Sequence, residues 1–305
     1  MSVLPPEALF RVEAELPDLR GAVLVEMLDG FIDAGAARRI SREHLLGAGP
    51  SVIAVTFDVD LLHDYRARRP PMVFQADHWE SYDAPTLEIR LLTDEAGTPY
   101  LLLCGSEPDV MWDRFAAAVQ LLVERFEVRM TVGTNAIPMA VPHTRPTAIT
   151  AHASRKELIA GYEPWVSTVT VPASAGHLIE HRLAKAGHDS VGFAVHVPHY
   201  LAQAAYPPAA EALLRAVGRV SGLSLPVGGL EEASREAQSS IAALVAQSEE
   251  LTELVATLEK QYDALVADRG ASLTEAGSLP TADELAAELE RFLADQPHKR
   301  GDDPV

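Results

Sequence analysis

The arrangement of apolar segments over the first 225 residues constrains the fold most strongly, because strand-like runs alternate there with helix-like segments. The run Tyr100–Cys104 is continuously apolar, which is typical of a strand buried on both faces, and a helix of about four turns is predicted from Val110 to Arg125. Further strands are predicted at 22–26, 52–57, 87–92, 128–132, 148–151, 168–171 and 191–197, and further helices at 36–46, 175–185 and 208–220. This alternation predicts a three-layer α/β/α sandwich around a mostly parallel or mixed sheet.

Small and polar residues follow the predicted strands, where α/β proteins bind their ligands. The clearest case is the strand 128–132, which is predicted to stop at Gly133 and to open into a proline-punctuated loop over 136–146. That loop carries three functional groups in a row: the titratable ring of His143, the hydroxyl of Thr144 and the planar cation of Arg145. The candidate pocket residues are Asp29, Gly30, Asp33, Gly105, Glu107, Gly133, Thr134, Asn135, His143, Arg145, His196 and His199.

Composition narrows the class of protein. The 305 residues carry a formal net charge of −19, which disfavours nucleic acid and anionic membranes as partners because both bind basic surfaces. The single cysteine, Cys104, excludes an internal disulfide and fits a reducing compartment. The N-terminus lacks the features of a signal peptide, and no apolar run has the length of a membrane span. A soluble cytoplasmic protein is therefore expected.

The last quarter of the chain differs from the rest. Residues 229–305 hold 17 acidic and 6 basic residues, and the helix-breaking run Leu225–Gly229 lies at the start of this region. We therefore expect an α/β domain at 1–228, an acidic helical domain at 229–297 and a disordered tail at 298–305.

Apolar residues recur at alternating spacings of four and three from Ala237 to Leu265, and only Ser248 interrupts this seam. One helix of about 60 Å is predicted from Leu230 to Asp268, ended by Gly270. A capping box at 281–284 then predicts a second, shorter helix. The pattern fits either a helical hairpin within one chain or an intermolecular coiled coil, and the spacing does not separate the two.

Short motifs give no complete catalytic constellation. His177, Glu180 and His181 match the H-x-x-E-H string of a zinc peptidase class, but no third protein ligand is identified, so a solvated helix face is the better interpretation. Residues Gly105–Asp109 are expected to cap the helix that follows them. The segment Asp29–Gly35 lacks the glycines of a dinucleotide fingerprint, and no nucleotide P-loop occurs, so no cofactor is expected.

The segments 30–35, 105–108, 133–139 with 143–146, and 195–200 form an ordered set. This set resembles the proteasome assembly chaperone 2 family, and its actinobacterial members most, over roughly residues 20–225. The resemblance implies a phosphorylase/hydrolase-like α/β/α fold, and some members carry an acidic helical extension. Because the eukaryotic members help to assemble proteasome α-rings without doing chemistry, it also implies proteasome-related protein partners.

Two functions remain open. The favoured one is a non-enzymatic assembly or scaffold protein that holds partners, or copies of itself, through its surface and its helical C-terminal region. The alternative is a phosphorylase- or hydrolase-like enzyme, or a binder of a small anionic ligand, that uses the strand-end pocket. There Arg145 would clamp the anion and Thr134 and Asn135 would orient it. Glu107 or His143 would then move a proton.

Overall fold

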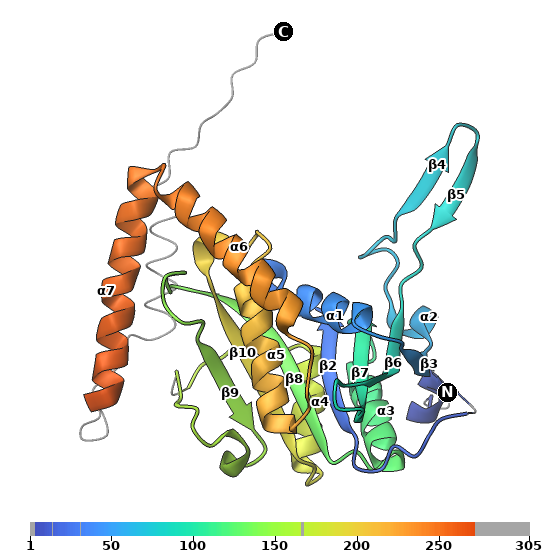
Figure 1. Cartoon of the computed structure of the whole chain (residues 1–305). Helices are drawn as coiled ribbons and strands as arrows, with labels where there is room; N and C mark the ends of the chain where they lie inside the picture. The colour runs from blue at the N-terminus through green and yellow to red at the C-terminus, as the bar shows by residue number, and fades with distance from the viewer. Residues whose placement is uncertain (1–3, 14, 31, 166–167, 272–305) are drawn as a thin grey trace.

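The computed structural model describes residues 4–13, 15–30, 32–165 and 168–271. Within these residues, one eight-stranded sheet runs through the molecule in the order β1-β3-β6-β7-β2-β8-β10-β9, and helices cover both of its faces (Figure 1). Its strands are β1 Phe10–Val12, β2 Val23–Asp29, β3 Val52–Phe57, β6 Leu87–Thr93, β7 Pro99–Ser106, β8 Met130–Met139, β9 Ile149–Ala153 and β10 Ser190–Pro198. The predicted three-layer sandwich is confirmed.

The helices are α1 Ala37–Gly47, α2 Val59–Leu62, α3 Trp112–Arg125, α4 Ala175–Lys185, α5 Pro207–Ser221, α6 Gly228–Val245 and α7 Glu249–Ala271. A separate hairpin, β4 Met72–Gln75 with β5 His78–Tyr82, projects from the body of the molecule (Figure 1). None of the helices in the described part of the chain combines the length and the apolar character that a membrane crossing needs.

The four central strands, β7, β2, β8 and β10, are parallel to one another, and β6 and β9 pair antiparallel with the outer two of them. The carboxyl ends of these strands therefore meet at one edge of the sheet, where ligand sites of α/β proteins form.

Alternation along β2 divides the core into two clusters. Val23, Val25 and Met27 belong to the cluster that includes residues of α1 and α5, whereas Leu24 and Leu28 pack with residues of α3 and α4. Each of these side chains stabilises the fold by about 1.5–3 kcal/mol through burial. Glu26 lies between Leu24 and Leu28 on the face that packs against α3 and α4, so a carboxyl group is placed inside an apolar layer.

Cys104 of β7 lies in the first cluster and is 3% exposed. Burial raises the pKa of its thiol to about 12, so the thiol is a core group and not a nucleophile at neutral pH.

Strand β8 is longer than the sequence predicts. It pairs in parallel with β10 from Thr131↔Ser190 to Met139↔Pro198. The predicted strand end at Gly133–Asn135 is therefore wrong, and the first part of the predicted loop, as far as Met139, belongs to the strand. The neighbouring strand β2 pairs with β8 only as far as Gly133. Pro138, which lacks an N–H group, is tolerated in β8 because it lies where the strand has lost this second partner.

The predicted single helix over 230–268 is also wrong. It is divided into α6 and α7 at 246–248, where Ser248 accepts a hydrogen bond from the N–H of Leu251 at 3.3 Å and so caps α7. Helix α7 continues through Gly270, which does not end it. The segment 168–171 forms no strand, since it pairs with none of the described strands. The helix predicted from Thr281 and the tail at 298–305 lie outside the described residues.

Candidate functional site

A polar cluster occupies the place where β2 and β8 separate. The strands pair from Val23↔Met130 to Glu26↔Gly133, after which β2 continues beside β7. Arg38 of α1 enters the gap, and its two terminal nitrogens donate hydrogen bonds, each of 3.3 Å, to the carbonyls of Thr134 and Ile32. The guanidinium thus supplies donors to the backbone at the point where strand pairing stops.

Glu26 is the buried carboxyl group of this cluster and is 4% exposed. Its Oε1 accepts a hydrogen bond from the N–H of Leu28 at 2.9 Å. Burial raises the pKa of Glu26, and the opposing charge of Arg38 does not cancel the shift. The protonated form of Glu26 is therefore favoured relative to an exposed glutamate.

A histidine–glutamate pair lies on the same face of the sheet. His152 of β9 and Glu180 of α4 are 2.6 Å apart, between Nδ1 and Oε1. Partial burial disfavours the imidazolium, but the hydrogen bond to Glu180 and its charge outweigh burial and raise the pKa of His152. Gly192 makes room for the pair, since a Cβ there would lie 2.0 Å from Cε1 of His152.

Glu107 connects this cluster to α4. Its Oε1 accepts a hydrogen bond from the N–H of Ala175 at 2.5 Å, at the positive end of the helix. The expectation that residues 105–109 cap the helix after them is therefore wrong. Helix α3 begins only at Trp112, and the carboxylate of Asp109 accepts instead from the N–H of Asp64 at 2.7 Å.

Together these groups form a buried polar cluster whose pKa values are shifted. Such shifts occur at functional sites and also in structural ion-pair networks. Here Glu26 is held toward its neutral form, and His152 toward its charged form by Glu180. Gly176 lets α4 approach closely, since a Cβ there would lie 2.8 Å from Oε2 of Glu26.

Replacing Glu26 with glutamine is expected to remove a pH dependence of stability. The folded-state pKa of Glu26 is raised from 4.5, so its stabilising contribution is full below pH 4.5 and is lost as pH rises through the folded value. The Glu26→Gln variant should therefore gain stability relative to the wild type as pH increases from 4 toward 8. Urea unfolding across this range measures the difference, and parallel pH profiles would contradict the assignment.

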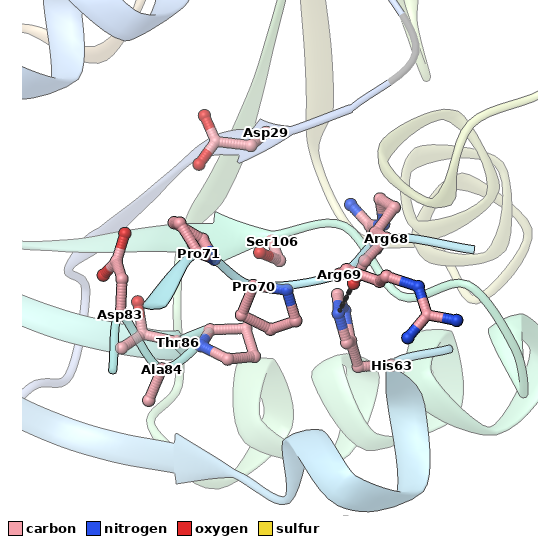
Figure 2. Close-up of a pocket in the computed structure, with 12 residues that line it drawn as sticks. Asp29, His63, Arg68, Arg69, Pro70, Pro71, Asp83, Ala84, Thr86 and Ser106 are labelled. Atoms are coloured by element: carbon pink, nitrogen blue, oxygen red, sulfur yellow. Dashed lines mark hydrogen bonds between the residues drawn. The ribbon is translucent and has the colours of Figure 1, made fainter. Parts of the chain in front are cut away.

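On the other side of the strand ends lies a cleft of about 300 Å³ (Figure 2). Asp29 at the end of β2 and Gly105 and Ser106 at the end of β7 line it, together with the chain that enters and leaves the hairpin. The Asp29 carboxylate forms an ion pair with Arg42. Gly105 has a φ of +106°, and a Cβ at this position would lie 2.0 Å from the carbonyl oxygen of Thr86. The cleft wall at this point therefore requires glycine.

The structure separates the predicted pocket residues into groups. Gly30 and Gly133 lie against the polar cluster, since a Cβ on Gly30 would be 3.0 Å from Oε2 of Glu107 and one on Gly133 would be 3.7 Å from Oε2 of Glu180. Thr134 belongs to the cluster as well, and its hydroxyl donates to the carbonyl of Glu26 at 2.7 Å.

Two predicted residues have local structural roles. The Asp33 carboxylate accepts hydrogen bonds from the N–H groups of Arg38 and Arg39 at 2.8 and 3.0 Å, and so caps the first turn of α1. The Oδ1 atom of Asn135 accepts from the N–H of the next residue, Ala136, at 2.8 Å.

Arg145 and His143 are engaged elsewhere. Two nitrogens of Arg145 bind the Asp263 carboxylate at 2.7 and 2.8 Å, and a third contact at 3.1 Å reaches Glu259, so both partners come from α7. His143 is buried, with Nδ1 2.7 Å from the hydroxyl of Tyr200, and burial lowers its pKa. The cation predicted to clamp an anionic ligand is thus paired with carboxylates of the chain itself.

The two remaining histidines also have partners in the protein. His196 of β10 is 1% exposed, and its Nε2 lies 2.8 Å from the Thr150 hydroxyl. Its ring meets Trp165 edge-on with centroids 4.7 Å apart. His199 follows β10 and meets the ring of Tyr200 edge-on at 5.5 Å. These contacts hold the end of β10 in place.

The H-x-x-E-H string lies on α4, as predicted, but its glutamate binds His152. Burial, with the charge of His152, lowers the pKa of His177. Within the described part of the chain, no three side chains of metal-binding type are grouped so that they could hold an ion. In this arrangement the carboxylate of Glu180 is engaged by His152 of β9.

Sequence reasoning missed the hairpin. Every residue of β4 and β5 is exposed, and five large apolar side chains stand on it. They are Met72, Val73, Phe74, Trp79 and Tyr82, with exposed fractions from 48% to 63%. The signal that could have found it is the pair of aromatic and β-branched runs, 72–75 and 78–82, on either side of a two-residue turn.

Comparison with known proteins gives one family match. A model of the PAC2 family matches residues 27–245. No curated protein matches the chain.

Several solved structures are similar over most of their length. The Mycobacterium tuberculosis protein of unknown function Rv2714 is 46% identical with a TM-score of 0.82, covering 95% of this chain and 96% of that one. A Corynebacterium glutamicum protein of unknown function is 34% identical with a TM-score of 0.81, covering 85% and 98%. The M. tuberculosis proteasome-assembly chaperone homologue Rv2125 is 25% identical with a TM-score of 0.70, covering 76% and 99%.

Proposed function

The chain belongs to the PAC2 family, and from this we propose that it is a non-enzymatic protein that binds other proteins in a chaperone-like role. A proteasome-assembly chaperone homologue among its similar structures supports a proteasome-related partner. The proposed role needs a surface that is free in the isolated chain and apolar enough to hold a partner.

The projecting hairpin is the observation that carries this proposal. Exposed apolar groups that gather in one place mark protein-binding sites, whereas single exposed ones are ordinary. Of the eleven large apolar side chains exposed in the described residues, five stand on the nine strand residues of the hairpin. Phe74 and Trp79 meet edge-on with ring centroids 5.1 Å apart, which gives the hairpin an aromatic centre. Such residues are the usual anchors of protein interfaces.

An enzyme or anion binder at the strand ends has weaker support. That reading required Arg145 to face a ligand, and α7 holds its guanidinium through Glu259 and Asp263. It also required Asn135 to orient the ligand, and this side chain bonds its own neighbour. The expectation that the helical C-terminal region is the binding element also becomes less favoured, because α7 contacts the α/β domain of the same chain.

The test is binding to purified proteasome α-subunits from the organism that encodes the chain. The full-length protein should form a complex by sedimentation velocity, and Phe74→Ala with Trp79→Ala should weaken it at least about tenfold, because interface aromatics contribute 1–2 kcal/mol or more each. Circular dichroism should show an unchanged fold, since neither side chain is buried.

Val52→Ala is the matched control, because Val52 is 57% exposed but lies on β3. It should bind as the wild type does. Full affinity in the double hairpin variant would remove the hairpin as the interface. If the wild-type chain does not bind α-subunits, the proposal of a proteasome-related partner is wrong.

A further inference from the structure

Two charged side chains in the cleft of Figure 2 have no partner within the described part of the chain. Arg69 precedes the hairpin and Asp83 follows it, and both are exposed. The other charges that line the cleft are already paired, Asp29 with Arg42 and Arg68 with Asp109 at 2.8 Å.

The positions of the two groups give the cleft a direction. Figure 2 shows Asp83 at one end and Arg69 at the other, with Pro70, Pro71 and Thr86 between them. A ligand that complements both ends must carry an acidic group and a basic group, separated by the length of the cleft.

The walls of the cleft are rigid. Three prolines line it, and the end of β7 is fixed by the hydrogen bond from the N–H of Ser106 to the carbonyl of Thr86 at 2.7 Å. His63 is fixed too, with Nε2 2.9 Å from the carbonyl of Arg68. Preformed walls reduce the ordering cost of binding. A volume of about 300 Å³ is at the lower end for ligand pockets and admits a short segment.

We propose that this cleft binds a short extended peptide segment of the protein partner, with an acidic side chain at Arg69 and a basic side chain at Asp83. The inference rests on the proposed protein-binding function, because the cleft lies at the base of the hairpin and a partner held by the hairpin would pass over it. Charge at the two ends fixes the direction of the segment, and the proline-lined middle accepts apolar side chains.

The probe is the end-blocked peptide Glu-Leu-Ala-Leu-Lys, titrated into the ¹⁵N-labelled full chain and followed by NMR. Amide shifts are expected at Arg69, Asp83 and Ser106. Arg69→Glu should weaken the peptide about fivefold, because an exposed ion pair contributes little and its reversal adds repulsion. The loss should shrink as salt is raised.

Arg66→Glu is the matched control. Arg66 is exposed and does not line the cleft, and its substitution changes the net charge by the same amount. It should weaken the peptide less than about twofold, through long-range charge alone. The double variant Arg69→Glu with Asp83→Arg should prefer the charge-exchanged peptide Lys-Leu-Ala-Leu-Glu.

Equal losses of peptide affinity in the Arg66 and Arg69 variants would overturn the inference. So would the absence of amide chemical-shift changes in the cleft at millimolar peptide. Hairpin-dependent binding of the α-subunits would then still stand, because it is measured with Phe74 and Trp79. If the cleft binds the peptide but the α-subunits do not bind, the proteasome-related partner fails and the peptide site remains.

Discussion

Replacing Gly105 with alanine is expected to destabilise the α/β domain by more than about 3 kcal/mol, which is the range of strained or overpacked core substitutions. Two costs combine at this position. Its φ of +106° is unfavourable for any residue with a Cβ, and the new atom would lie 2.0 Å from the carbonyl oxygen of Thr86. That oxygen is backbone and accepts the N–H of Ser106, so it has no alternative rotamer. Urea unfolding at fixed pH measures the loss.

Gly97→Ala separates the two costs. Gly97 also has a positive φ, of +84°, but a Cβ there would meet no atom within 4 Å. This variant should lose about 1 kcal/mol, the cost of the backbone conformation alone. If both variants lose the same amount, the close contact with Thr86 is not what requires glycine at the end of β7.

Gly192→Ala is expected to break the His152–Glu180 pair. The added Cβ would lie 2.0 Å from Cε1 of His152 and 2.6 Å from Oε2 of Glu180, so both side chains must leave their present positions. Because His152 is 43% exposed, its ring can turn outward, and the cost should stay near about 1–2 kcal/mol. The pKa of His152 should fall toward its ordinary value once Glu180 no longer supports the imidazolium. Histidine NMR signals followed through a pH titration report that change.

The neighbouring strand supplies the control. Gly133 of β8 is the register partner of Gly192, and a Cβ there would be at ordinary contact distance, 3.7 Å from Oε2 of Glu180. Gly133→Ala should leave the pKa of His152 raised and change stability by less than about 1 kcal/mol. An unchanged titration of His152 in Gly192→Ala would show that the pair does not depend on the space over β10.

The local pattern of apolar residues was sufficient to predict most strands and helices of the three layers. The apolar run Tyr100–Cys104 became the buried part of β7, and the helix predicted at 175–185 has the same bounds in the structure. These segments are decided by their own periodicity and burial, which a single sequence contains. The seam over 237–265 misled because its spacing continues through Ser248, whereas the capping preference of that serine decides where α7 begins.

The polar cluster was harder to predict because it depends on pairing across the sheet. Glu26, His152 and Glu180 come from β2, β9 and α4, and nothing near any of them in sequence indicates the other two. The sequence predicts Gly133 at a strand end, but it lies within β8, opposite Gly192. Strand register is set by long-range packing, so the side chains that share a face cannot be read from one segment alone.

Arg145 shows that the partners of a surface side chain are equally hard to predict from sequence. Its sequence neighbours, His143 and Thr144, suggested a ligand site, and its partners proved to be Glu259 and Asp263, more than a hundred residues away. A cation without an evident partner in sequence is a weak indication of a ligand when the same chain carries an acidic helical segment.

The hairpin stands outside both hydrophobic clusters, and its side chains contribute to neither. Substitutions at Phe74 or Trp79 can therefore accumulate without loss of core stability, because both side chains are exposed. With the hairpin as the proposed interface, partner preference can diverge between related chains while the α/β body stays the same, and no compensating change is needed in the core.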